Sequence, residues 1–259
     1  ALFYAAQLCG VTQMFKIGGS QAIAAMAQGT ESVPAVYKIF GPGNQYVTAA
    51  KMYANRMGIA IDMPAGPSEV AVFADATANP AFIASDLLSQ AEHGHDSQVV
   101  LISTSEQILN ESIAEIQKQL ADLPRKEFAA NALNNSKFIL LKSNEDAIEL
   151  LNEYGAEHLI LACENPEEFA DLISNAGSIF LGHFTPESAG DYASGTNHTL
   201  PTNGFAKAYS GVNLDSFVKK ITLQAISQAG LANIGPSIIQ MAEAESLQAH
   251  ANAVKIRLS

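Results

Sequence analysis

The stretch SQAEHG at residues 89–94 places an amide and an imidazole three positions apart. It follows apolar residues at helical spacing from Pro80 onward, so Gln90 and His93 are expected on one face of a helix end. An imidazole nitrogen suits Zn²⁺, and an amide oxygen is a harder companion ligand. A solvated helix end without metal explains the pair as well, so a metal site is indicated only if other residues supply further ligands.

Three later segments supply such groups. Glu157 and His158 stand together directly before the apolar run 159–163, and Asp191 lies in the polar stretch 186–202. Glu245 and His250 follow near the C-terminus, five residues apart and therefore on different helix faces. Each has a plain structural explanation too: a solvated Glu, a capped His, or an Asx turn at Asp191.

The composition of the chain limits what it can bind. The 259 residues are 48% hydrophobic, which is enough to bury a core and long enough for two domains. A net charge of −12 argues against nucleic acid and anionic membrane as partners. No apolar run reaches membrane-spanning length, and no signal peptide is expected. Cys9 and Cys163 give no disulfide framework, so a cytoplasmic location is expected.

Strand-like and helix-like segments alternate along the chain, which predicts α/β layers with mostly parallel sheets and a small helical C-terminal segment. The turn signal PAGP at 64–67 marks a domain boundary, and 186–202 is expected to be a loop. The expected strands are 11–17, 36–40, 59–62, 69–73, 98–103, 138–141, 158–162 and 178–181. The expected helices are one ending near 9–10, then 21–27, 45–57, 80–92, 106–123, 144–154, 166–175, 217–228 and 236–257.

These motifs, with GGSQ (18–21), KIFGPGN (38–44) and DMPAGPSE (62–69), stand in the order and approximate spacing of histidinol dehydrogenases. The chain resembles this family closely from its first residue almost to its last. The resemblance implies a cytoplasmic homodimer that oxidises L-histidinol to L-histidine through the aldehyde with Zn²⁺ and two NAD⁺, the final steps of histidine biosynthesis. It implies Rossmann-like layers, with a partial NAD-side domain at 1–66, a zinc and catalytic domain at 67–210 and a dimerisation segment at 211–259.

The resemblance also assigns roles to individual residues. Glu157 matches the residue that activates water, and His158 the residue that shuttles protons. The remaining matches are Gln90, His93, Asp191 and His250 for zinc; Ser68, His198, Glu245 and again the zinc ligands and His158 for substrate; and Gln21 and Asn44 for NAD. In the family the C-terminal helix crosses to the partner, so Glu245 and His250 would serve the neighbouring subunit's site.

Other interpretations of the same residues stay open. GPGN at 41–44 offers backbone N–H groups to an anion, but a tight turn explains it equally well, and Ser68 can be a simple cap. His95 stands where the family usually has a proline, so it is interpreted as exposed and not a ligand, and His183 is interpreted as a loop residue. Cys163 lies an odd number of residues from His158 along an expected strand, which argues against a covalent cysteine intermediate.

Two rival functions follow from the same sequence. A zinc hydrolase would use Glu157 as base and need no dinucleotide. A folded but inactive module is the other alternative, because against the family the chain corresponds to a C-terminal portion that begins without an initiator Met.

Overall fold

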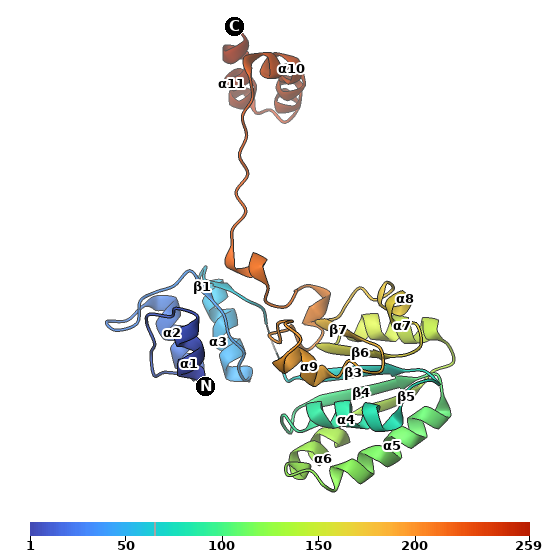
Figure 1. Ribbon diagram of the computed structural model, residues 1–259. Coiled ribbons are helices and arrows are strands. Elements are labelled where there is room, and N and C mark those ends of the chain that lie inside the picture. The colour runs from blue at the N-terminus through green and yellow to red at the C-terminus, as the bar shows by residue number, and fades with distance from the viewer. Residues whose placement is uncertain (65) are drawn as a thin grey trace. The chain divides into compact units, whose positions relative to one another are not determined.

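The computed structural model describes residues 1–64 and 66–259, so Ala65 in the expected boundary lies outside the described residues. The chain forms two units, Ala1–Phe217 and Val218–Ser259, and each is described by itself (Figure 1). The division expected at 66/67 and 210/211 stays a prediction.

The centre of the first unit is a fully parallel five-stranded sheet with the order β5-β4-β3-β6-β7. Its strands are β3 (Glu69–Ala74), β4 (Gln98–Ser103), β5 (Lys137–Leu140), β6 (His158–Ala162) and β7 (Ser178–Leu181). Every residue of the central strands β3 and β6 is buried, as expected for parallel strands covered on both faces. In the register, Val70 pairs with His158, so β3 and β6 begin at the same edge of the sheet.

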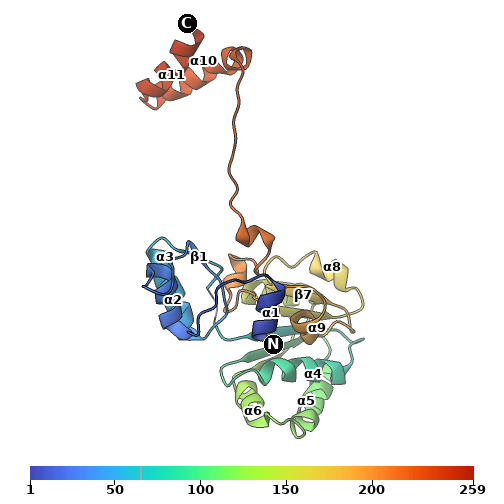
Figure 2. The same cartoon turned by 60° about the vertical axis from the view of Figure 1, so that its left-hand side comes forward.

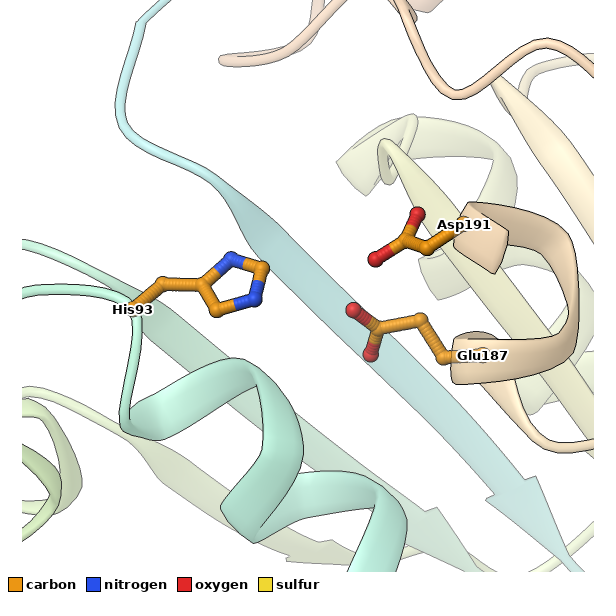
Figure 3. Close-up of side chains that lie close together, drawn as sticks. All are labelled: His93, Glu187 and Asp191. Carbon is orange, nitrogen blue, oxygen red and sulfur yellow. The ribbon is translucent and has the colours of Figure 1, made fainter. Parts of the chain in front are cut away.

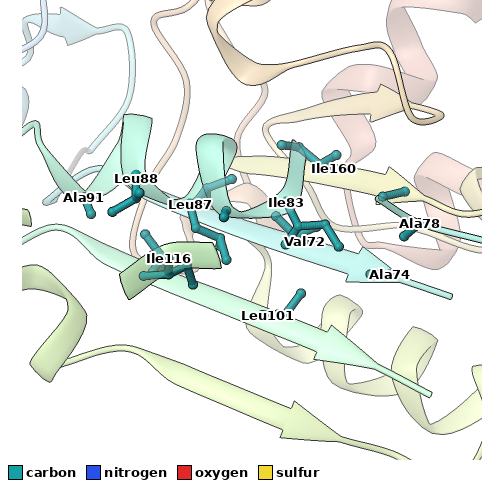
Figure 4. Close-up of a cluster of buried hydrophobic side chains, with 14 of the residues drawn as sticks. Val72, Ala74, Ala78, Ile83, Leu87, Leu88, Ala91, Leu101, Ile116 and Ile160 are labelled. Carbon is teal, nitrogen blue, oxygen red and sulfur yellow. The ribbon is translucent and has the colours of Figure 1, made fainter. Parts of the chain in front are cut away.

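Helices cover both faces of this sheet. Alternate residues of β3 face opposite ways: Val70 and Val72 pack with helices α4, α5 and α6, and Phe73 packs with α7 and α8. Figures 1 and 2 show α4, α5 and α6 together on one side of the sheet, and Figure 4 shows the core beneath them. The helices of the first unit are α1 (Leu2–Leu8), α2 (Gly19–Gln28), α3 (Gln45–Arg56), α4 (Pro80–Ala91), α5 (Glu106–Leu120), α6 (Lys126–Asn134), α7 (Asn144–Tyr154), α8 (Pro166–Ala170) and α9 (Glu187–Tyr192).

Local sequence signals fix the helices that lead to the site. The Asn79 side chain caps α4 by accepting from the Ala81 backbone N–H at 2.9 Å, and Pro80 stands at the first helical position. Helix α7 ends at Gly155, whose φ of 63° is the left-handed conformation that glycine adopts without strain. The chain then needs only Ala156 and Glu157 to enter β6.

A two-stranded parallel sheet, β1 (Lys38–Ile39) and β2 (Ala60–Ile61), packs with α2 and α3. A buried ion pair between Lys51 and Asp62 holds the loop that follows β1. Lys51 donates to the Gly41 carbonyl at 2.9 Å, and Asp62 accepts from the Gly41 N–H at 2.8 Å. Both backbone groups of Gly41 are therefore fixed by one charged pair.

Several expected elements differ in the structure. The strand at 11–17 is wrong: no described residue pairs with this segment, and without a partner its backbone has no ladder to join. The helix at 217–228 is also wrong. Ile221 and Leu223 are exposed, so no packing of an apolar face supports a helix there. Helices α6 and α9 were not expected.

The second unit contains a pair of helices, α10 (Gln228–Ala244) and α11 (Gln248–Leu258), where the sequence predicted one helix at 236–257. Ser246, with a φ of 61°, lies in the turn between them. Gly235 allows close packing, since a Cβ there would lie 2.7 Å from Leu258 Cδ1. None of the described helices is both long and apolar enough to span a bilayer.

Candidate metal and catalytic site

The candidate site lies where β3 and β6 begin, at the amino ends of the strands. Glu157 directly precedes β6, and its Oε2 accepts from the Glu69 backbone N–H at 3.1 Å. Gly177 makes room on the other side, because a Cβ there would lie 2.5 Å from the Glu157 carbonyl oxygen. The side chain of Glu157 is thus held by a backbone that is itself tightly packed.

Burial dominates the electrostatics of Glu157. Desolvation raises the pKa of its carboxyl to about 8, and the neighbouring charges of Glu69 and Asp191 act in the same direction. Hydrogen bonds from the Glu69 backbone and the Ser68 side chain oppose the rise. The resulting group can hold or release a proton near neutral pH, as a general acid or base must.

His158, the first residue of β6, is 4% exposed. Its Nδ1 lies 3.4 Å from the Glu69 carbonyl oxygen, which can only accept, so this contact favours the tautomer with the proton on Nδ1. The other nitrogen, Nε2, is buried without a hydrogen-bond partner and lies 3.8 Å from Asp191 Oδ1. Desolvation lowers the pKa of His158 to about 4, so the ring is neutral at pH 7 and Nε2 carries a lone pair.

Two carboxylates come from α9, inside the stretch that was expected to be a loop. Glu187 and Asp191 are four residues apart and share one helix face. Gly190 brings this helix against β7, because a Cβ there would lie 2.7 Å from the Phe180 ring. The Glu187 backbone also hydrogen-bonds the Asp86 carboxyl on α4.

His93 faces these two carboxylates from just beyond the end of α4 (Figure 3). One ligand atom each from His93, Glu187 and Asp191 lies within 4.8 Å of the other two. Gln90 is fully buried on α4, and its Nε2 is 3.5 Å from His93 Nδ1. The structure therefore places His93 near both Gln90 and Asp191, three residues that the family resemblance singles out, and adds Glu187.

The donor atoms in this cluster fit a divalent cation. Gln90 Oε1 and Glu187 Oε2 are both buried and have no hydrogen-bond partner in the described structure. Unpartnered buried oxygens cost free energy unless a ligand satisfies them. Imidazole, amide and carboxylate together form a nitrogen and oxygen set that suits Zn²⁺ and similar ions.

Two cavities adjoin the site and share Ser68 in their walls. The first, of about 470 Å³, is lined by Asn44 and His93 among others. The second, of about 220 Å³, is lined by Glu157 and His198 among others. His198 is exposed, and its Nδ1 lies 3.8 Å from Asp191 Oδ1.

The two residues predicted to contact NAD, Asn44 and Gln21, lie in different surroundings. The Asn44 side chain caps α3 by accepting from the Tyr46 and Val47 backbone N–H groups at 3.1 and 3.2 Å. Gln21 is exposed on α2, where its Oε1 accepts from the Ser20 hydroxyl. Only Asn44 of the two lines a cavity described above.

Four other residues considered from the sequence are Glu245, His250, His95 and His183. Glu245 directly follows α10 and His250 lies on α11, both in the second unit, so their roles stay predictions. His95 stacks on Phe128, with ring centroids 4.2 Å apart. His183 Nε2 lies 3.2 Å from the Thr77 hydroxyl, beyond the opposite ends of the strands.

Glu187 is the residue that sequence reasoning missed. Its signal was the four-residue spacing to Asp191, which places two carboxylates on one face only if the segment is helical. Because 186–202 was expected to be a loop, the four-residue spacing did not predict that the two carboxylates share a face.

The comparisons with known proteins agree along the whole chain. The family model described as histidinol dehydrogenase matches residues 1–258. A histidinol dehydrogenase from Bacteroides thetaiotaomicron is 64% identical over all of this chain and 60% of its own length. One from Yersinia pestis is 54% identical over all of this chain and 59% of its own length.

A solved structure gives the same result in three dimensions. The crystal structure of histidinol dehydrogenase from Elizabethkingia anophelis superposes with a TM-score of 0.97 at 60% identity, covering 99% of this chain and 59% of that one. The chain thus spans about 60% of the length of the curated relatives it matches. By sequence and by fold, the chain belongs to the histidinol dehydrogenase family.

Proposed function

We propose that this chain carries the metal and proton-transfer centre of an enzyme that oxidises L-histidinol to L-histidine with Zn²⁺ and NAD⁺. The observation that carries the proposal is the meeting of Glu157, His158 and the cluster of His93 and Asp191 at one edge of the sheet. Family membership supplies the reaction. The proposal includes a cytoplasmic location and a role in histidine biosynthesis.

The proposed metal ligands are Gln90, His93 and Asp191, with His250 as the fourth. The unpartnered Gln90 Oε1 and the short separation of the His93 and Asp191 ligand atoms support the first three. When bound, zinc would act as a Lewis acid that orients the substrate, and NAD⁺ would accept hydride. Gln21 and Asn44 are the proposed NAD contacts, and the cavity of about 470 Å³ beside Asn44 and His93 supports that side.

His158 is proposed to accept the proton of the substrate hydroxyl. Its Nδ1 is directed to the Glu69 carbonyl, so Nε2 carries the lone pair on the side of Asp191. Burial keeps the ring neutral at pH 7, which leaves this lone pair available. After it has passed that proton on to solvent, the same nitrogen can accept a second proton when the hydrated aldehyde is oxidised.

Glu157 is proposed to activate water for attack on the aldehyde in its ionised form, which a pKa of about 8 makes available in mildly alkaline solution. Its Oε2 lies 3.7 Å from His158 Nδ1, so both groups border the same space. Ser68 donates to this carboxylate and lines both cavities, which supports its proposed contact with substrate. His198 lines the smaller cavity and is proposed as a further substrate contact.

The test is NADH formation from L-histidinol and NAD⁺ with zinc present, for the 259-residue chain and for a version extended to its relatives' full length. Glu157→Gln should lower turnover by about 10²–10⁴-fold, as expected for loss of a general base. Glu149→Gln, an exposed carboxylate on α7, is the matched control and should leave it unchanged. Absence of NADH from both chain lengths, with zinc bound, would refute the dehydrogenase proposal and favour the zinc hydrolase.

The second unit is proposed to serve a homodimer, with Glu245 and His250 completing the partner's site. In the same proposal, residues 1–66 form part of the NAD-binding domain, residues 67–210 form the catalytic domain, and residues 211–259 form the dimerisation segment. Mixing Glu157→Gln chains with His250→Ala chains should restore part of the activity through hybrid dimers. No recovery at any mixing ratio would contradict a shared site.

A further inference from the structure

We propose that Glu69 is a positioning residue of the candidate site: its buried carboxylate holds the turn at 202–204 and thereby sets the wall of the smaller cavity. This inference rests on the proposed function, which places the substrate beside Ser68 and His198 in that cavity. Glu69 is not among the described residues that line the cavity, so it acts through the groups that it holds.

The backbone of Glu69 contacts both proposed catalytic residues. Its N–H donates to Glu157 Oε2 at 3.1 Å, and its carbonyl oxygen lies 3.4 Å from His158 Nδ1. The Glu157 backbone N–H in turn hydrogen-bonds the Glu69 carboxyl, so the two residues hold each other. Any residue at this position could supply the backbone groups. The side chain is therefore what makes a glutamate necessary here.

The Glu69 side chain reaches a turn that is far away in the sequence. Its Oε1 accepts from the Asn203 backbone N–H at 2.9 Å, and the Gly204 backbone also hydrogen-bonds the carboxyl. Asn203 and Gly204 have φ values of 56° and 72°, and the left-handed conformation is uncommon for a residue other than glycine. Such a backbone persists only where its surroundings hold it. The Glu69 carboxyl supplies that support.

A second contact joins the same turn to the segment before β3. The Gly66 N–H donates to the Thr202 hydroxyl, and a Cβ at Gly66 would lie 3.0 Å from Asn203 Cβ. Thr202 is 3% exposed, and both Thr202 and Gly66 line the smaller cavity. A displacement of the turn would therefore move the wall of the cavity on the side that Glu69 holds.

The chemistry around the carboxyl of Glu69 calls for an acid and not for an amide. Each of its described hydrogen-bond partners is a donor: the backbone N–H groups of Asn203, Gly204 and Glu157, and the Tyr154 hydroxyl at 3.4 Å. A carboxylate offers two acceptor oxygens, whereas an amide would direct its own N–H₂ group at these donors. Desolvation raises the pKa of the carboxyl, and the donors oppose the rise because they favour the ionised form.

The experiment compares three variants with the unchanged protein. Glu69→Gln keeps the shape of the side chain but replaces one acceptor oxygen by a donor, and Glu69→Ala removes both acceptors. Glu149→Gln, on the exposed side of α7, makes the same change of net charge away from the site. Hydrogen exchange of the Asn203 amide is followed by nuclear magnetic resonance in the 259-residue chain. Steady-state kinetics are measured in the chain length that forms NADH, and circular dichroism confirms that each variant is folded.

We expect the Asn203 amide to exchange at least about tenfold faster in Glu69→Gln, and faster still in Glu69→Ala, while the amides of β3 and β6 keep their protection. The KM for L-histidinol should rise at least about tenfold in Glu69→Gln, and the KM for NAD⁺ should stay within about threefold. Glu149→Gln should match the unchanged protein in both measurements. A general loss of stability would not separate the two KM values.

Three results would contradict the inference. If both Glu69 variants leave the exchange of the Asn203 amide unchanged, the carboxylate does not hold the turn. If exchange is faster but the KM for L-histidinol is unchanged, the turn does not set the cavity wall, and the inference fails while the proposed function stands. If the unchanged protein forms no NADH at either chain length, the proposed function fails and takes this inference with it.

Discussion

Glu157→Gln removes an ionisable group whose pKa is about 8 in the folded chain, against an ordinary value of 4.5. Between these two values the folded state holds a proton that the unfolded chain has released. The folded state therefore binds more protons than the unfolded state, and the free energy of unfolding falls as the pH rises through this window. Glutamine has the same shape as the protonated carboxyl and does not titrate.

The size of the effect follows from the pKa values. A difference of one pH unit in this window corresponds to about 1.4 kcal/mol. From pH 5 to pH 8, Glu157 should therefore reduce the free energy of unfolding of the wild type by about 3–4 kcal/mol. The variant should match the wild type closely at pH 5 and exceed it by about that amount at pH 8. Groups that do not interact with Glu157 contribute equally to both proteins and cancel in the difference; Glu187, whose pKa the neighbouring Glu157 charge helps to raise, is coupled to it and belongs to the same effect.

Urea unfolding followed by far-ultraviolet circular dichroism measures this difference, with a chelator present so that no metal charges the site. The two proteins are compared at pH 5 and pH 8 at one ionic strength. Glu149→Gln serves as control. Because the Glu149 carboxylate is exposed, the variant should differ from the wild type in free energy of unfolding by the same amount at pH 5 and pH 8. A Glu157→Gln effect that is equal at pH 5 and pH 8 would refute the argument that burial keeps this carboxyl protonated.

Three further changes test other parts of the first unit. Gly190→Ala places a Cβ 2.7 Å from the Phe180 ring, so it should cost about 1–3 kcal/mol of stability and weaken Zn²⁺ binding at least about tenfold, measured by urea unfolding and calorimetry. Lys51→Met leaves Asp62 buried without its cation and should lower stability by about 3–5 kcal/mol in the same unfolding assay. Cys163→Ala should leave turnover largely intact, because burial raises the pKa of the thiol to about 11; a loss of several orders of magnitude in NADH formation would contradict this.

The sequence predicted most of the central layers because their signals are local and strong. The apolar run of β6 and the Asn79-Pro80 start of α4 both correspond to observed boundaries. The segment 11–17 also contains apolar and β-branched residues, but it has no partner strand among the described residues, and no local signal reports a missing partner. Helix α9 was missed because its packing depends on Gly190 meeting Phe180, a contact between different elements.

The site could be predicted in part for the same reason. Gln90 and His93 sit on one helix end, so their proximity follows from spacing. Their meeting with Asp191 was expected only from the family resemblance, since it needs α4 and α9 to face each other. Glu187 could not be found without knowing that α9 is helical. The long-range packing of short elements is what the sequence left open.

The candidate site occupies only the edge of the sheet where the strands begin, so it is well separated from the edge where they end. The strand β6 runs five residues from His158 to Ala162, and at about 3.3 Å per residue it places the far edge roughly 15 Å away. The turns after Ala74 and Ser103 belong to that far edge. Those turns therefore lie well beyond hydrogen-bond reach of the charged cluster, and their own hydrogen bonds, such as the one from the Glu164 N–H to Asp75, stabilise the sheet without touching the site.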